Sequence, residues 1–384
     1  MKNYVKLPKP VGDFVVGISH TEFEYIDDEQ NKRVIPVTVY YPADRKEGKK
    51  SHPYAFPEVF KGKDHENILK AKTHCYADVQ VSNRQPDFPV LIYNQCYGGF
   101  EMMNTVLCSD LASRGYVVAS VGHPGESSIR YLDGRITKVH PKYVEAMTSG
   151  ELLKNIMPLF EEFKTIPEEQ DEVLVDMARR FFEMQPFNIR VKVWVLDTVK
   201  TADHLEKLNL GGGPALFHGK LRLGAGIGLT GHSFGGSTVM QALHDDARFV
   251  CGINMDGGNF GDYYGEDIKK PLLGIGNPSI WKMLKAVFLS NSSDSYHLTV
   301  GKTDHMGFTD MLFLTRQPVE QDRLGTRDPD NFREVLTIYH LMFFDKYLLQ
   351  KTIALRDIRF EDTRFYEKLA KNNDCKYSYF HGIR

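Results

Sequence analysis

The chain has 384 residues, 42% of them hydrophobic, so it can bury a sizeable core. Its 48 Lys and Arg residues nearly balance its 50 Asp and Glu residues, and the formal net charge is −2. This balance argues against nucleic acid or an anionic membrane as the main partner and favours a small neutral substrate.

The five cysteines are odd in number and scattered, without a Cys-x-x-Cys pair. This pattern predicts neither a disulfide framework nor a zinc site. The N-terminus lacks the apolar core of a signal peptide, and no apolar run reaches the roughly 18 residues needed to span a bilayer. We therefore expect a cytoplasmic protein without a transmembrane segment, unless a signal has been removed.

The first elements in chain order are two strand-like segments, residues 14–26 and 34–41, joined by a charged turn. Their β-branched and aromatic residues predict an antiparallel pair. Residues 44–87 are charged, contain proline and follow no period. We expect surface loops with a short helix there.

From residue 89 onward, short apolar runs alternate with segments of helical period. Strands are predicted at 89–93, 116–121, 225–230, 249–255, 272–276 and 296–300, and helices at 103–111, 191–205, 237–243 and 332–349. This alternation predicts a mainly parallel sheet with helices on both faces, within one domain over residues 1–384.

Residues 137–187 interrupt the alternation. They make the connection between the strand at 116–121 and the helix at 191–205 too long for a plain βα unit. Pro167 followed by acidic residues, with Arg179 and Arg180 further on, indicates a helix within this insertion. Two interpretations stay open: an ordinary helical excursion packed on the core, or a cap over an active site that shapes an acyl pocket.

The most informative motif is Gly231-His232-Ser233-Phe234-Gly235, which fits Gly-x-Ser-x-Gly between a strand pattern and a helix pattern. Such a turn raises a serine hydroxyl above the sheet, where a base can activate it. The motif, the antiparallel start and the βα alternation together predict an α/β-hydrolase fold with Ser233 as nucleophile.

A serine nucleophile needs a histidine base, and position must select it from the 14 histidines. His305 lies in the loop between the last strand and the last helix, which should return to Ser233. His297 lies inside a strand pattern and His340 inside a helix pattern. We therefore predict His305 as the base.

The orienting acid should follow a strand and precede the histidine in the chain. The loop after the strand at 272–276 has no carboxylate at Asn277, whereas Asp256 stands at the tip of the preceding strand with a glycine behind it. We predict Asp256, with Asp304 and Asp310 as alternatives; Asp304 adjoins His305 and would approach it awkwardly.

Two backbone N–H groups are needed to bind the oxyanion. The residue after the nucleophile, Phe234, supplies one, and Tyr97 in the loop after the strand at 89–93 is predicted to supply the other. Gly98, Phe100 and His232 are predicted to contact the substrate. The bulk of Tyr97 and Phe100 would leave little room for a long acyl chain.

Four segments resemble the plasma and type II intracellular platelet-activating-factor acetylhydrolase family: residues 37–42, 110–121, 231–239 and 248–257. The resemblance implies a calcium-independent serine lipase that removes short or oxidised sn-2 acyl groups from phospholipids. The family's acid also follows the strand next to the elbow, as Asp256 does. Its histidine loop ends in Phe-x-Asp and matches His305 through Asp310, and its oxyanion donors correspond to Tyr97 and Phe234.

Two features depart from that family. Gln95-Cys96 replaces the His-Gly before the oxyanion donor, so the geometry of the hole or the acyl preference can differ. Residues 137–187 have no counterpart that we can match, so substrate recognition does not carry over.

The sequence therefore predicts an ester hydrolase that needs no metal or cofactor and cleaves a short acyl group. The resemblance implies the sn-2 acetyl of a phospholipid as such a group, with peripheral lipid contact. The alternative is a general short-chain carboxylesterase, or a polyester or diene-lactone-type hydrolase, acting on soluble substrates. A non-catalytic binding protein of the same fold is disfavoured, because serine, acid and histidine all occur in order. The sequence does not predict the oligomeric state.

Overall fold

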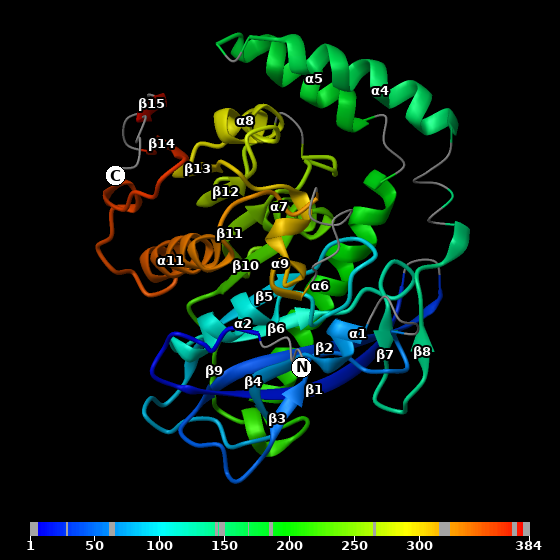
Figure 1. The fold of residues 1–384 in the computed structure, drawn as a ribbon, viewed down its shortest axis with the longest axis vertical. Coiled ribbons are helices and arrows are strands. Elements are labelled where there is room, and N and C mark those ends of the chain that lie inside the picture. The colour runs from blue at the N-terminus through cyan, green and yellow to red at the C-terminus, as the bar shows by residue number, and fades with distance from the viewer. Residues whose placement is uncertain are drawn as a thin grey trace.

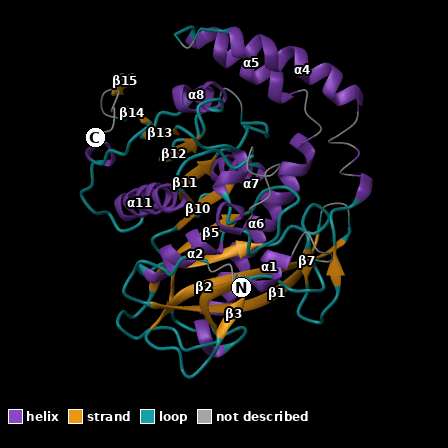
Figure 2. Cartoon of the chain, viewed as in Figure 1, coloured by secondary structure: helices purple, strands orange, loops and turns teal. Residues whose placement is uncertain are grey.

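The computed structural model describes residues 7–27, 30–60, 66–142, 145, 150–167, 169–183, 187–263, 266–314, 323–370 and 375–378. A large mixed β-sheet runs through these residues (Figure 1). Helices cover both of its faces (Figure 2). None of the helices in these ranges combines the length and the apolar character that a membrane span requires.

The strands follow the order β15-β14-β13-β12-β11-β10-β5-β6-β2-β1-β4-β3, with β9 (Leu221–Arg222) beside β5. The six central strands, which are mutually parallel, are β5 (Phe88–Asn94), β6 (Val117–Val121), β10 (Ile227–His232), β11 (Phe249–Met255), β12 (Leu272–Gly276) and β13 (Ser295–Val300). All six fall where the sequence predicts strands, and the predicted α/β-hydrolase architecture is confirmed. Their carboxyl ends define the edge of the sheet at which Ser233 emerges.

The predicted antiparallel pair is confirmed as β1 (Val15–Ile26) and β2 (Lys32–Ala43). The expectation of surface loops with a short helix for residues 44–87 is wrong in part. This segment does hold the helix α1 (Glu66–Lys70), but it also contributes β3 (Ser51–Pro53) and β4 (Lys72–Ala77), and β4 pairs in parallel with β1. The strand is too short and polar to show a period, and pairing with β1 stabilises it.

Two layers of helix enclose the sheet. The helices α2 (Thr105–Ser113) and α11 (Pro329–Tyr347) contribute buried side chains to the core on one face. The helices α6 (Phe187–Asn209) and α7 (Phe234–Asp245) bury theirs in the core on the other face. The sequence predicted a helix in each of these four places, and a helix that packs on a sheet must turn apolar side chains toward it.

The sequence interpretation missed the elements around the last parallel strand. The helix α8 (Trp281–Ser290) connects β12 to β13. After α11 the chain returns to the sheet as β14 (Thr363–Lys368), which pairs antiparallel with β13, and β15 (Cys375–Ser378) extends that edge. Two short strands, β7 (Ile129–Arg130) and β8 (Ile136–Thr137), form a separate hairpin.

The insertion at 137–187 is helical, as predicted, in its described part. It contains α4 (Gly150–Thr165) and α5 (Asp171–Glu183); residues 143–144, 146–149, 168 and 184–186 lie outside the described residues. Figure 1 shows the two helices side by side beyond α8. Phe163 and Leu174 pack with Met283 of α8, and Lys285 of α8 forms a 2.5 Å ion pair with Asp171.

Candidate active site

Ser233 lies on the turn between β10 and α7 in a conformation that few non-glycine residues adopt. Its φ is 60° and its ψ is −122°. Such backbone strain persists only where the surroundings enforce it, and it lifts the side chain off the end of the strand. This is the geometry of a nucleophile elbow, as the sequence motif predicted.

The glycines around Ser233 are required by close backbone contacts. A Cβ on Gly231 would lie 2.4 Å from the carbonyl oxygen of Gly235, and one on Gly235 would lie 2.1 Å from that of Asn94. A Cβ on Gly257 would lie 2.3 Å from the carbonyl oxygen of Ser233. Only glycine allows the elbow, the end of β5 and the turn after β11 to approach this closely.

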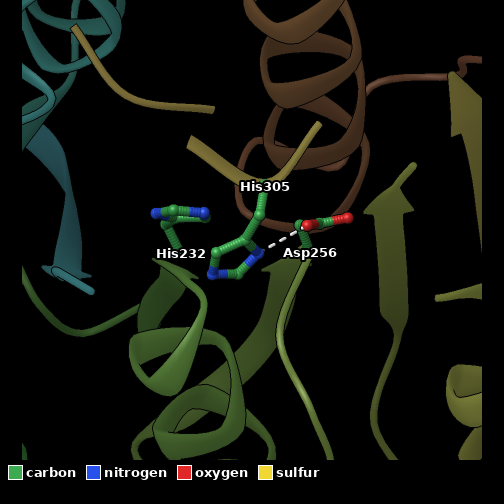
Figure 3. Close-up of side chains that lie close together, drawn as sticks. All are labelled: His232, Asp256 and His305. Atoms are coloured by element: carbon green, nitrogen blue, oxygen red, sulfur yellow. Dashed lines mark hydrogen bonds and ion pairs between the residues drawn. The ribbon is translucent and has the colours of Figure 1, made fainter. Parts of the chain in front are cut away.

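His305 and Asp256 lie in a hydrogen-bonded series with Ser233. Nε2 of His305 is 2.8 Å from Oγ of Ser233, and Nδ1 of His305 is 2.7 Å from Oδ2 of Asp256. Figure 3 shows the His305 ring directed at Asp256. The Asp256 side chain is 1% exposed and that of His305 is 40% exposed, so the acid is shielded while the base faces solvent. The structure thus brings together the three residues predicted as nucleophile, acid and base.

The two alternative acids have other positions. Asp304 precedes His305 and caps the short 3₁₀ helix His305–Phe308, with its side chain accepting from the His305 backbone N–H at 2.6 Å. Asp310 is buried at the start of α2, where its oxygens lie 3.2 and 3.3 Å from the backbone N of Val106. Burial raises the pKa of Asp310 well above its ordinary value, although the N–H of Val106 opposes this. The ring nitrogens of His305 are hydrogen-bonded to Asp256 and Ser233 rather than to either of these carboxylates.

Asn277 holds Asp256 and was passed over in the sequence because its loop offers no carboxylate. The Asn277 backbone N–H donates to Oδ1 of Asp256 at 2.7 Å, and its side-chain amide lies 2.9 and 3.0 Å from the two carboxylate oxygens. The residue follows β12, the strand next to β11, so the carboxyl ends of two adjacent strands meet here. The position of Asn277, directly after the strand adjacent to that of Asp256, was the signal that could have identified it.

His232 lies beside the triad but is not part of its hydrogen-bonded series. Its ring centroid is 4.8 Å from that of His305 (Figure 3), and its ring stacks on Phe308. Burial lowers the pKa of His232 well below its ordinary value, and the neighbouring His305 adds to this. The ring is therefore neutral.

Donor atoms of His232, Asp256 and His305 all lie within 4.8 Å of one another, so this group is the candidate metal site among the described residues. Both ring nitrogens of His305 already face Ser233 or Asp256. A metal ion bound here would have to displace one of these contacts. The donor set therefore fits a proton-transfer series better than a metal centre.

The loop at residues 95–99, after β5, lies against the elbow. A Cβ on Gly235 would come within 2.5 Å of the Gln95 carbonyl oxygen, so the backbones of the loop and of the elbow are in contact. The ring centroids of Tyr97 and Phe234 are 5.8 Å apart. The rings of the two residues predicted as oxyanion donors therefore pack against each other, and their backbone N–H groups as donors stay a prediction.

The predicted substrate contacts differ in their surroundings. Gly98 has a φ of +75°, and a Cβ on it would meet no atom of the described residues within 4 Å. Phe100 is buried and packs against Tyr54 and Phe60, with centroid distances of 5.5 and 4.9 Å. Its ring therefore belongs to the core formed with the N-terminal strands, whereas Tyr97 packs beside the elbow.

Trp194 of α6 is a further residue at the site that the sequence interpretation missed. It is fully buried; its ring lies 4.9 Å from that of Phe234 and stacks on Tyr97 at 6.4 Å. Val191 and Phe260 complete this aromatic cluster. The helical stripe of α6 indicated a buried face here, but nothing in its spacing indicates that this face reaches the elbow.

The fold and the hydrogen-bonded series Ser233–His305–Asp256 define an α/β-hydrolase-fold chain with a Ser-His-Asp triad. Residues 1–359 match the model of the family described as platelet-activating factor acetylhydrolase, isoform II. The chain belongs to this family.

Curated relatives are similar at moderate identity. The platelet-activating factor acetylhydrolase of Gallus gallus is 26% identical over 285 residues, which cover 69% of this chain and 63% of that protein. The Bos taurus protein of the same name is 28% identical over 242 residues, covering 59% of this chain and 49% of that protein. A probable 1-alkyl-2-acetylglycerophosphocholine esterase of Arthroderma benhamiae is 25% identical over 178 residues, covering 45% of this chain and 32% of that protein. The matches thus span less than two thirds of the length of these relatives.

Among solved structures, a ferulic acid esterase from Streptomyces cinnamoneus superposes with a TM-score of 0.70 at 22% identity. The match covers 94% of this chain and 99% of that structure. At this identity the likeness establishes the shared fold.

Proposed function

We propose that the chain is a serine ester hydrolase that acts through an acyl-enzyme on Ser233. The observation that carries this proposal is the series from Ser233 Oγ through His305 to Asp256, with contacts of 2.8 and 2.7 Å. A serine raised on a strained elbow, a base within hydrogen-bond reach and an acid that orients the base are the parts that acyl transfer requires. The family and its curated relatives support the same reaction.

The geometry supports the following sequence of steps. As Ser233 Oγ attacks the ester carbonyl, Nε2 of His305 takes its proton and then gives it to the departing alcohol. Asp256 fixes the tautomer of His305 and stabilises the imidazolium that forms. In the second half, His305 takes a proton from water, which attacks the acyl-enzyme, and returns that proton to Ser233.

The backbone N–H groups of Phe234 and Tyr97 are proposed to bind the oxyanion. Phe234 is the first residue of α7, so its N–H belongs to the positive end of that helix. The close approach of the Gln95 carbonyl oxygen to Gly235 supports a position of the Tyr97 N–H on the same side of the elbow. Donors fixed in this way need no rearrangement when charge develops on the carbonyl oxygen.

We propose a short acyl ester as the substrate, with the sn-2 acetyl group of a phospholipid as the first candidate. The family and the relatives named above support this choice. In the structure, the bulky rings of Tyr97 and Trp194 pack against Phe234, the residue that follows Ser233. An acyl pocket walled by such rings would exclude long chains by steric overlap.

The helices α4 and α5 are proposed to act as a cap on this side of the site. Phe260 packs against Phe234 at 5.7 Å and also against the cluster formed by α4, α5 and α8. Phe260 therefore links the insertion to Phe234, the residue that follows the nucleophile. Peripheral contact with a lipid surface and the cytoplasmic location expected from the sequence stay predictions.

Ser233 is tested with a fluorophosphonate probe. Wild type should be labelled at one site, and Ser233→Ala should abolish labelling and lower kcat on the order of 10⁶-fold. Labelling that persists in the alanine variant would contradict the assignment.

The substrate is tested by measuring kcat/KM on p-nitrophenyl esters from acetyl to lauroyl and on a phospholipid with an sn-2 acetyl group. A maximum at short acyl length with turnover of the phospholipid supports the proposal. Activity on soluble acetyl esters alone would favour the carboxylesterase alternative. A maximum at long chains would refute the short-acyl preference.

A further inference from the structure

A buried polar cluster that takes no part in the triad adjoins the 95–99 loop. Its centre is Asp197 of α6, whose side chain is fully buried. Asp197 accepts hydrogen bonds from Arg33 at 2.9 and 2.7 Å, from the Tyr25 hydroxyl at 2.6 Å and from Nδ1 of His123 at 2.9 Å. Burying this many polar groups is costly unless every partner is in place, so the cluster has one well-defined arrangement.

His123 connects this cluster to the start of the 95–99 loop. Its Nε2 lies 3.1 Å from the side-chain amide of Asn94, the last residue of β5. Its ring stacks on Trp194 with a centroid distance of 3.7 Å and an interplanar angle of 10°. Trp194 in turn contacts both Tyr97 and Phe234, the two proposed oxyanion donors.

The loop that begins with His123, residues 123–128, runs along the 95–99 loop and is bonded to it at three points. Gln95 Nε2 donates to Ser127 Oγ at 2.6 Å. The Gly98 N–H donates to the Glu126 carbonyl at 2.8 Å, and the Ser128 N–H donates to the Gly99 carbonyl at 2.9 Å. The buried Glu126 carboxylate also pairs with Arg190 of α6.

We propose that His123 is a positioning residue, which holds the 95–99 loop so that the Tyr97 N–H lies beside that of Phe234 for the oxyanion. This inference rests on the proposed function. The His123 ring is held between Asp197, Asn94 and Trp194, and it fixes the end of β5. The 123–128 loop, which begins at His123, fixes residues 95–99. Gln95, which departs from the family pattern, is bonded to this same loop.

His123 acts in its neutral form. Burial lowers its pKa, with Asp197 opposing that shift. Although burial alone would raise the pKa of Asp197, Arg33 and His123 hold it below its ordinary value. The ring therefore donates from Nδ1 to a charged Asp197 and accepts at Nε2. Rotating the Asn94 side-chain amide by 180° exchanges the positions of its oxygen and nitrogen. Its NH₂ group then donates to Nε2 of His123 and to the Thr198 hydroxyl.

The test replaces His123 by Phe, which keeps the stacking on Trp194 and removes both ring hydrogen bonds. Asp197 keeps Arg33 and Tyr25, so its charge stays paired. His123→Gln restores a polar group toward Asn94. The matched control is His297→Phe. His297 is a buried histidine on β13 whose ring centroid lies 4.4 Å from that of Trp281, and it lacks a ring hydrogen-bond partner among the described residues.

Three quantities are measured: kcat and KM on p-nitrophenyl acetate, the affinity for a boronic acid that forms a tetrahedral adduct on serine, and hydrogen exchange of the amides at 95–99. Loss of one oxyanion donor costs about 10²- to 10³-fold in kcat, so displacing one should cost about 10- to 100-fold. His123→Phe should show this loss in kcat with KM within about threefold, an equal loss of boronate affinity, and faster exchange at 95–99. His123→Gln should recover part of each effect.

A kcat of His123→Phe equal to that of His297→Phe, or a loss confined to KM, would overturn the inference. Hydrogen exchange does not depend on hydrolysis, so it separates two failures. A wild type without esterase activity refutes the proposed function, whereas unchanged exchange at 95–99 in a folded His123→Phe or His123→Gln refutes the positioning role.

Discussion

Replacing Asn277 by alanine tests whether the triad depends on a residue that supplies no chemistry itself. The substitution removes the side-chain amide that lies 2.9 and 3.0 Å from the Asp256 oxygens. It keeps the backbone N–H that donates to Oδ1 at 2.7 Å. In the variant, residue 277 therefore still donates to the Asp256 carboxylate from its backbone, but no longer from a side chain.

The size of the effect follows from the burial of Asp256, whose side chain is 1% exposed. Water cannot easily replace the lost donor, and a hydrogen bond to a charged group contributes about 1.5–3 kcal/mol. Losing this stabilisation matters most in the transition state, where His305 carries a positive charge. Since about 1.4 kcal/mol corresponds to a factor of ten, kcat should fall about 10- to 100-fold. Asp256→Asn, which disturbs the tautomer of His305, should cost about 10⁴-fold.

The assay is kcat and KM on p-nitrophenyl acetate, together with the rate of fluorophosphonate labelling and the melting temperature. Ser279→Ala is the matched control, because it removes an exposed 2.5 Å bond to Asn277 Oδ1 and leaves every contact on Asp256 in place. We expect this control within about threefold of wild type. An Asn277→Ala variant that folds and turns over as fast as Ser279→Ala would refute the reasoning.

Three further predictions follow from single features. Gly235→Ala places a Cβ 2.1 Å from the Asn94 carbonyl oxygen, so it should lower the free energy of unfolding by about 1–3 kcal/mol and reduce activity. Gly224→Ala should do neither, because a Cβ there meets no atom within 4 Å in the described part of the chain. Urea unfolding and kcat check this prediction. Burial lowers the pKa of His297 to about 3, so the folded protein keeps this ring neutral while the unfolded chain protonates it below about pH 6.5. The free energy of unfolding should therefore decrease as pH falls below 6.5, and His297→Phe should reduce that slope by up to about 1.4 kcal/mol per pH unit in urea titrations; an unchanged slope would contradict this. Ester hydrolysis should be unaffected by EDTA, and activity that is lost with chelator and restored by a divalent ion would show that a metal is required.

The sequence by itself determined the local features that depend on short stretches of chain. Gly231, Ser233 and Gly235 predicted the elbow because glycines two positions before and after the serine permit a sharp turn from a strand into a helix. The order of strands and helices predicted the parallel sheet, and with it the loops that carry Asp256 and His305. These predictions succeeded because each rests on a period or a turn that neighbouring residues specify.

Only the tertiary structure decided which distant residues meet. Cys75 and its neighbours form a sheet strand because β1 offers an edge, which no local pattern in residues 72–77 reveals. Asp304 and Asp310 could be set aside only when their own partners were seen, at the 3₁₀ helix and at the start of α2. The contacts of Asn277 with Asp256 and of His123 with Asn94 join the ends of neighbouring strands, 21 and 29 residues apart in the chain, and such contacts follow from packing rather than from spacing in the sequence.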